Sequence, residues 1–184
     1  MLRGNKELWW AFAVGALITI VYGTVVFFTR EIPAASELFG HGLGILGFML
    51  MLMTETLYSL RKRSRSARWG RMSSWLQFHI FTGLVGPFMV LLHTSWKFNG
   101  LAGAVTLLTV VIVISGVIGR YIFTRIPRTM DGLEIEGTLS ESALRQARRL
   151  MALWHTIHIP IGMALFVSAF VHIGAALYFA TLLK

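Results

Sequence analysis

The sequence predicts an all-α integral membrane protein, a single membrane domain over residues 1–184 with five transmembrane helices. Hydrophobic residues occupy 55% of the positions and the mean hydropathy is +0.68, whereas soluble domains are usually about 45–50% apolar. A transmembrane helix needs about 20 consecutive, mostly apolar residues. Five stretches meet this requirement: about 8–29, 38–60, 73–96, 100–124 and 153–182.

The first stretch has some features of a secretory signal, because Arg3 and Lys6 precede its apolar core. That core, from Leu8 to Phe28, is longer than the roughly 7–15 residues of a signal core. The Glu31-Ile32-Pro33 segment that follows is also a poor cleavage site. We therefore predict a transmembrane helix here.

The second stretch begins with Gly40-x3-Gly44, a small-residue pattern typical of close helix packing in membranes. The fourth stretch is apolar from about residue 100 until Arg120 near its end. Each of these stretches is expected to cross the membrane once.

The connection over about 125–152 contains turn signals at Ile126-Pro127 and Asp131-Gly132. The segment Thr138-Leu139-Ser140-Glu141 is typical of a helix-capping box. We expect an amphipathic helix from about Ser140 that lies near the cytoplasmic interface and runs into the fifth stretch. Its polar face would carry Arg145, Arg148 and Arg149 toward water or anionic lipid.

The basic residues predict the orientation. With the N-terminus in the cytoplasm, fourteen of the 17 Lys and Arg residues lie on the cytoplasmic side, and only Arg30, Lys97 and Lys184 lie outside. Five crossings then leave the C-terminus external. The net charge of +9 is concentrated in loops rather than on one folded face, so nucleic acid is not an expected partner.

The third and fifth stretches share a W-x3-H-x3-G-x9-H register. Its two copies consist of Trp75, His79, Gly83 and His93, and of Trp154, His158, Gly162 and His172. Fourteen residues of α-helix bring the second histidine to within about 40° of the first and about 21 Å further along the axis. Each helix therefore presents two histidines on one face, near opposite membrane surfaces.

Helices three and five are separated by one helix, so they cross the membrane in the same direction. His79 then lies at the depth of His158, and His93 at the depth of His172. Two such helices side by side could hold two haem irons, each ligated by one histidine from either helix. The sequence thus predicts a haem-binding helical bundle with two haem b groups, one ligated by the pair His79–His158 and one by His93–His172.

Helix packing and zinc binding account for these histidines less well than haem does. Intramembrane histidines also form hydrogen bonds between helices, but four of them in two matched registers are hard to explain as packing alone. Zinc needs four ligands in one tetrahedron, and ligands about 21 Å apart cannot share an ion. The chain has no cysteine, which excludes covalent c-type attachment, so the haem would be held noncovalently.

Several further residues are candidates for the same site. Gly83 and Gly162 follow the inner histidines by one turn, where a missing side chain would let a porphyrin approach the helix. His155 forms an H-x-x-H with His158 and is a second candidate ligand, but the spacing to His172 favours His158. His155 then suits a propionate contact, proton exchange or simply the interface.

Charged residues at the helix ends are candidates for propionate and quinone contacts. Arg120 and Arg125 would serve the inner haem and Lys97 the outer one, although all three also fit simple membrane anchoring. His41, near the external end of its helix, suits a proton acceptor for quinol. Glu55, with Tyr58, is a cytoplasmic counterpart, although Glu55 also fits pairing with the neighbouring basic cluster.

The histidine register resembles that of the dihaem membrane cytochromes b. In respiratory cytochrome b, two histidines fourteen residues apart on each of two parallel helices hold two haems. The chain is also similar to the small cytochrome b subunits of bacterial quinone-linked dehydrogenases. His79, His93, His158 and His172 carry the resemblance, with Gly83 and Gly162 in support, and it covers helices three to five. The chain is much shorter than a full respiratory cytochrome b and lacks a Pro-Glu-Trp-Tyr-type quinol motif.

This resemblance implies an electron-transfer subunit in the bacterial inner membrane. It would pass electrons between quinone and a redox partner, an iron–sulfur protein or multihaem cytochrome c, within a multi-subunit oxidoreductase complex. One alternative is a transmembrane reductase of metal ions or small oxidised substrates, supplied by a flavoprotein. Another is a haem-free membrane anchor or transporter subunit that uses histidines as a proton relay.

Overall fold

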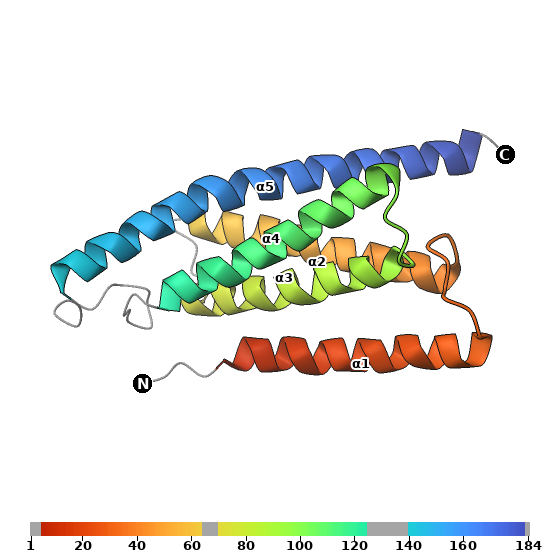
Figure 1. The fold of residues 1–184 in the computed structure, drawn as a ribbon, viewed down its shortest axis with the longest axis horizontal. Coiled ribbons are helices and arrows are strands. Elements are labelled where there is room, and N and C mark those ends of the chain that lie inside the picture. The colour runs from red at the N-terminus through yellow and green to blue at the C-terminus, as the bar shows by residue number, and fades with distance from the viewer. Residues whose placement is uncertain (1–4, 64–69, 125–139, 183–184) are drawn as a thin grey trace. The chain divides into compact units, whose positions relative to one another are not determined.

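The computed structural model describes residues 5–63, 70–124 and 140–182, and these residues form five α-helices with no strand among them (Figure 1). The helices are α1 (Lys6–Thr29), α2 (Leu38–Arg63), α3 (Met72–His93), α4 (Gly100–Thr124) and α5 (Glu141–Leu182). Each is long and apolar enough to cross a membrane. The predicted all-α class and the five helices of crossing length are confirmed.

The third helix is shorter than predicted. It ends at His93 rather than near residue 96, because Ser95 and Trp96 adopt left-handed backbone angles, with φ of 49° and 61°. Ser95 is buried and its Oγ donates a hydrogen bond to the Pro33 carbonyl at 2.6 Å. This bond ties the turn after α3 to the segment before α2, a long-range contact that the local sequence does not reveal.

The predicted amphipathic segment and the fifth transmembrane stretch form one continuous helix of 42 residues, α5. At 1.5 Å per residue it is roughly 63 Å long, about twice the thickness of a hydrocarbon core. The capping box was predicted in the wrong register: α5 begins at Glu141, and Ser140 Oγ accepts the Ala143 N–H at 3.3 Å as the N-cap. Thr138 lies outside the described residues.

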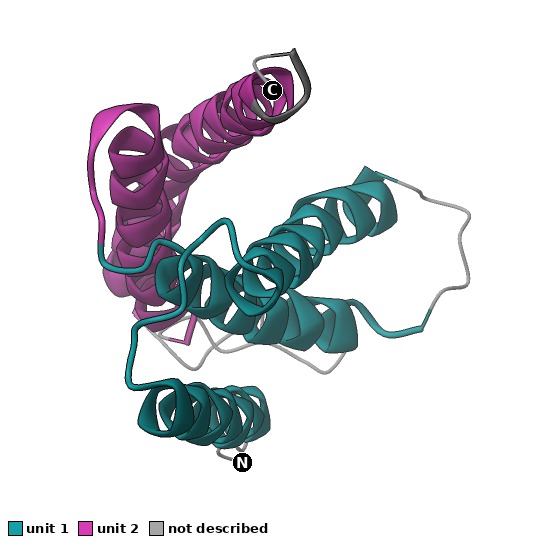
Figure 2. Ribbon diagram, turned by 90° about the vertical axis from the view of Figure 1, so that its right-hand side faces the viewer, with its two compact units in different colours: residues 1–96, 130–132 teal, residues 97–129, 133–184 magenta. Residues whose placement is uncertain are grey.

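The helices fall into two compact units, coloured teal and magenta in Figure 2. Described residues 5–63 and 70–96 form unit 1, and described residues 97–124 and 140–182 form unit 2. In unit 1, α2 packs against α3 and α1 also packs against α3. In unit 2, α4 packs against α5. Each predicted haem helix therefore has an adjacent helix within its own unit.

Close approach of α2 and α3 depends on paired glycines. A Cβ atom on Gly86 would lie 2.9 Å from the Gly47 carbonyl oxygen, and one on Gly47 would lie 2.8 Å from the Gly86 carbonyl oxygen. Further along the hairpin, Thr54 Oγ1 donates to Thr82 Oγ1 at 2.7 Å, and Thr82 is fully buried. Backbone contact and a buried hydroxyl pair are typical of helix association in membranes.

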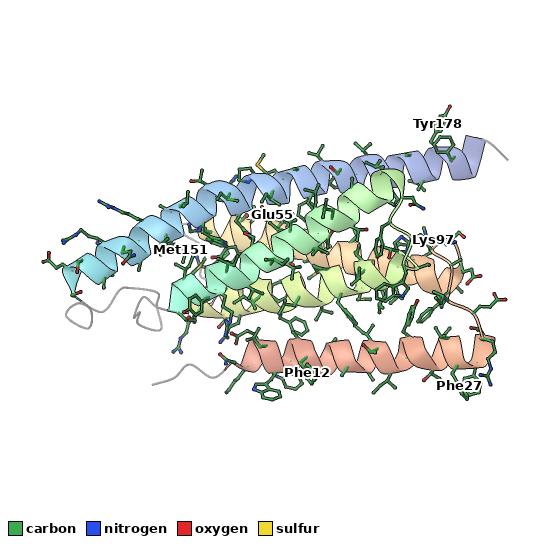
Figure 3. The ribbon with its side chains drawn as sticks, viewed as in Figure 1. Phe12, Phe27, Glu55, Lys97, Met151 and Tyr178 are labelled. Atoms are coloured by element: carbon green, nitrogen blue, oxygen red, sulfur yellow. The ribbon has the colours of Figure 1, made fainter. Side chains whose placement is uncertain are left out.

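Large apolar side chains cover the outside of the helices. Phe12 and Phe27 on α1 are 71% and 61% exposed (Figure 3). Soluble monomers rarely expose apolar surface on this scale. The outward-facing apolar side chains and the five long helices fit a multi-pass membrane protein.

Candidate haem-ligating site

His79 lies on α3 in unit 1, half-buried, with its ring held by α2. Its Nδ1 lies 3.2 Å from the Thr54 carbonyl oxygen. The Tyr58 ring, one turn further along α2, lies 4.8 Å from the imidazole ring, centroid to centroid. The buried bond between Thr54 and Thr82 fixes this turn of α2 against α3, so the carbonyl partner of His79 is held in place.

His93 is the last residue of α3 and has a similar environment. Its Nδ1 lies 2.8 Å from the Gly40 carbonyl oxygen. Gly44, one turn further along α2, faces the ring so closely that an added Cβ would lie 2.8 Å from Cγ and Nδ1 of His93. The Gly40-x3-Gly44 pattern thus serves a contact within the chain, with one glycine supplying the carbonyl and the other the space for the ring.

The two carbonyl partners determine the tautomer of both rings. A carbonyl oxygen only accepts hydrogen bonds, so Nδ1 of His79 and of His93 carries the proton and donates. Among the described residues, the hydrogen bonds of these two rings involve Nδ1. In a neutral imidazole with this tautomer, Nε2 carries the lone pair. Histidines that ligate metals usually donate their other ring N–H to a carbonyl or carboxylate in this way.

His158 lies on α5 in unit 2 and has a different partner. Its Nδ1 lies 3.0 Å from Ser115 Oγ on α4. The Trp154 ring stacks on the imidazole, with centroids 4.5 Å apart and 28° between the planes. His172, fourteen residues further along α5, is half-buried. Each predicted haem pair takes one histidine from each unit, so the pairing itself stays a prediction.

The glycines after the inner histidines are less crowded than those in the α2–α3 contact. A Cβ on Gly83 would meet only Thr54 Cγ2, at 3.5 Å, and one on Gly162 only Ile112 Cδ1, at 3.9 Å. These are ordinary van der Waals distances. Helix packing within the units therefore does not require glycine at either position, and the predicted role beside a porphyrin stays open to test.

The remaining predicted residues differ in their exposure and position. Lys97, which follows α3, is exposed, and Glu55 on α2 is exposed and accepts a hydrogen bond from Ser59 Oγ at 3.4 Å (Figure 3). Arg120 is half-buried on α4, and Arg125 lies outside the described residues. The His155 ring lies 4.8 Å from that of Trp154. Their predicted roles with propionates, protons or quinone stay predictions.

His41 lies closer to a candidate ligand than expected. Its exposed ring on α2 is 6.5 Å from the His93 ring, centroid to centroid. A titratable, exposed histidine beside His93 fits the predicted proton acceptor. The same distance makes His41 an alternative to His172 as the second ligand of a haem bound at His93. Substitution of His41 and of His172 distinguishes the two alternatives.

Sequence reasoning missed the groups that hold the histidine rings: the carbonyls of Gly40 and Thr54, the space at Gly44, and the Ser115 hydroxyl. A backbone carbonyl carries no residue-specific signal. Gly40 and Thr54 are, however, fourteen residues apart on α2, the spacing of the two histidines on α3. In the described ranges, no three His, Cys, Asp or Glu side chains gather as a metal-ion cluster. A haem iron needs only two protein ligands.

The described residues are all-helical, and their five helices, each long and apolar enough to cross a membrane, fit the class of multi-pass membrane proteins. No protein-family model, curated protein or solved structure matches the chain.

The contact at Gly44 predicts a selective loss. In the substitution Gly44→Ala, the new Cβ would displace the His93 ring and weaken its 2.8 Å bond to Gly40. We expect haem per chain to fall toward half, measured by pyridine haemochrome. Gly42→Ala is the matched control, since nothing lies within 4 Å of its Cβ position. Alanine favours a helix interior by about 1 kcal/mol over glycine, and this effect is the same in both variants. Equal haem content in both variants would therefore contradict the role of Gly44.

Proposed function

We propose that the protein is a dihaem b-type cytochrome subunit that carries electrons across the membrane between the quinone pool and a redox partner protein. The observation that carries the proposal is the bonding of the histidine rings. In two separate units, three of the four histidines of the repeated register have Nδ1 within hydrogen-bond distance of an oxygen on the adjacent helix. Metal-ligating histidines usually have the ring nitrogen opposite the ligating one held by such an oxygen.

The donor chemistry of these residues fits two haem b groups. Nδ1 of His79 and of His93 donates to a backbone carbonyl, so each ring offers Nε2 as a neutral nitrogen ligand. His158 and His172 would complete the two pairs from α5. When bound, haem iron would accept and donate single electrons. Without cysteine, the protein would hold both groups noncovalently.

The surrounding residues would orient these ligands and exclude water. The buried Thr54–Thr82 bond holds the Thr54 carbonyl beside His79, and Gly44 admits the ring of His93. Tyr58 contacts the ring of His79, and Trp154 stacks on that of His158. Fixed rings with shielded faces need little rearrangement when the charge on a ligated metal changes, which suits electron transfer.

The predicted topology supports a cellular setting for the proposed function. The predicted cytoplasmic N-terminus and external C-terminus, with basic loops inside, fit a multi-pass protein of the bacterial inner membrane. Two haems at different depths would connect quinone with an iron–sulfur protein or a multihaem cytochrome c. His41, exposed beside His93, is the proposed proton acceptor for quinol at the external side. The protein would work as a subunit of a quinone-linked oxidoreductase complex.

The visible spectrum of the detergent-purified protein tests the proposal. We expect two low-spin b haems per chain by pyridine haemochrome, reduced by a quinol analogue without any flavoprotein. Haem that only a flavoprotein can reduce would favour a transmembrane reductase of metal ions or small oxidised substrates. A colourless protein from haem-replete cells would refute the cytochrome assignment and favour a membrane anchor or transporter subunit.

A further inference from the structure

One residue of α4, Ser115, contacts two aromatic rings of α5 in unit 2. The Trp154 indole Nε1–H donates to the Ser115 carbonyl oxygen at 2.7 Å. The Ser115 hydroxyl lies 3.0 Å from His158 Nδ1. Ser115 is only 8% exposed, so both contacts lie in a low-dielectric environment where a hydrogen bond is strong. Backbone and side chain of the same residue thus hold neighbouring rings.

The indole of Trp154 occupies space that a glycine on α4 leaves open. A Cβ atom on Gly119, one turn beyond Ser115 on α4, would collide with Cε2 and Cζ2 of Trp154. The indole therefore lies directly against the α4 backbone, and its other face is available for stacking. Its ring plane is within 28° of that of His158. Trp154 and Ser115 together restrict both the tilt and the rotation of the imidazole.

The corresponding contacts in unit 1 are of a different kind. His79 and His93 donate to backbone carbonyls, which no substitution of the acceptor residue removes. The aromatic contact of His79 comes from Tyr58 on the adjacent helix rather than from the tryptophan four residues before the histidine. Trp75 instead has a ring contact with Phe78, at 6.0 Å. The hydroxyl partner and the stacked tryptophan distinguish His158 from His79.

We propose that Ser115 and Trp154 are positioning residues that orient the His158 ring and set its strength as an iron ligand, and hence the reduction potential and retention of one haem. This inference rests on the proposed function. Donation from Nδ1–H to an acceptor increases the basicity of the opposite nitrogen. A more basic ligand stabilises the oxidised, more positively charged iron and lowers the reduction potential. Loss of the Ser115 hydroxyl would therefore raise that potential.

The test uses Ser115→Ala in the full, haem-loaded chain. This substitution removes the hydroxyl but keeps the carbonyl that binds Trp154, so the two contacts are separated. Midpoint potentials are measured optically, and haem retention is measured by transfer to apomyoglobin. We expect two haems per chain, one redox component shifted to higher potential, and haem loss roughly 10–100-fold faster, as is typical when a ligand loses its hydrogen-bond partner. Ser115→Thr, which keeps a hydroxyl, should restore the original potential.

Two further variants complete the design. Thr156→Ala removes an exposed hydroxyl from α5 that bonds the Ala152 carbonyl, and both potentials should be unchanged. Trp154→Phe keeps an aromatic ring but loses the bond to the Ser115 carbonyl, and should shift the same component. If Ser115→Ala fails to accumulate, the Trp154→Phe potentials decide. Unchanged potentials and retention with two haems bound would overturn this inference alone, whereas absence of haem from the unsubstituted protein would overturn the proposed function.

Discussion

Replacement of His79 by alanine is expected to reduce the haem content from two per chain to about one. A b-type haem is held without covalent bonds, so loss of one of two axial ligands leaves the iron weakly bound. The same loss is expected for His93, His158 or His172. Haem per chain by pyridine haemochrome and the low-spin electron paramagnetic resonance signals give the result directly.

Double variants test the predicted pairs. His79→Ala with His158→Ala should lose no more haem than either single variant, because both residues would hold the same iron. His79→Ala with His93→Ala should lose both haems. If instead the His79 and His172 substitutions behave as one unit, the two ligand helices run in opposite directions, and the topology would need revision.

His41→Ala and His155→Ala are the controls for this series, and both should keep two low-spin haems. The ring of His41 lies 6.5 Å from that of His93, which makes this control informative. Loss of one haem in His41→Ala, with full retention in His172→Ala, would reassign the outer ligand to α2. It would also remove His41 as the proposed proton acceptor.

Substitution of Gly86 by alanine is expected to destabilise the α2–α3 hairpin by about 1–3 kcal/mol. The added Cβ would lie 2.9 Å from the Gly47 carbonyl oxygen and from Met51 Cγ. The carbonyl belongs to a helix backbone and cannot rotate away, so the helices must separate. Both His79 and His93 would then lose their carbonyl partners on α2. We expect a lower melting temperature whether or not haem is bound. We also expect a lower haem content in haem-replete cells.

Gly83→Ala is the matched control on the same helix. Its new Cβ would meet only Thr54 Cγ2 at 3.5 Å, so the haem-free protein should melt at or above the temperature of the parent, because alanine favours a helix interior over glycine. Lower haem content in this variant would support close approach of a porphyrin to Gly83. Equal melting of the Gly86 and Gly83 variants would contradict the packing role of Gly86, and full haem content in Gly83→Ala would contradict the predicted haem contact.

The local pattern of apolar and polar residues in the sequence predicts most of the helix bounds. The predicted and observed bounds of the fourth helix agree, because an uninterrupted apolar run is bounded by glycine at one end and by basic residues at the other. The end of α3 was misplaced because the left-handed turn at Ser95 and Trp96 is held by a bond to Pro33, a residue 62 positions away. The fifth helix extends back to Glu141 because Ser140 caps it there.

The sequence by itself determined the all-α class, the five helices of crossing length and the repeated histidine register, because each depends on residue type and on spacing along one helix. The tertiary structure decided what each ring contacts: carbonyls of Gly40 and Thr54 for unit 1, and the Ser115 hydroxyl with the Trp154 ring for unit 2. The physical reason is that these contacts join two helices. Backbone oxygens are alike at every position, so only the packing of α2 on α3 and of α4 on α5 selects the ones that meet a histidine.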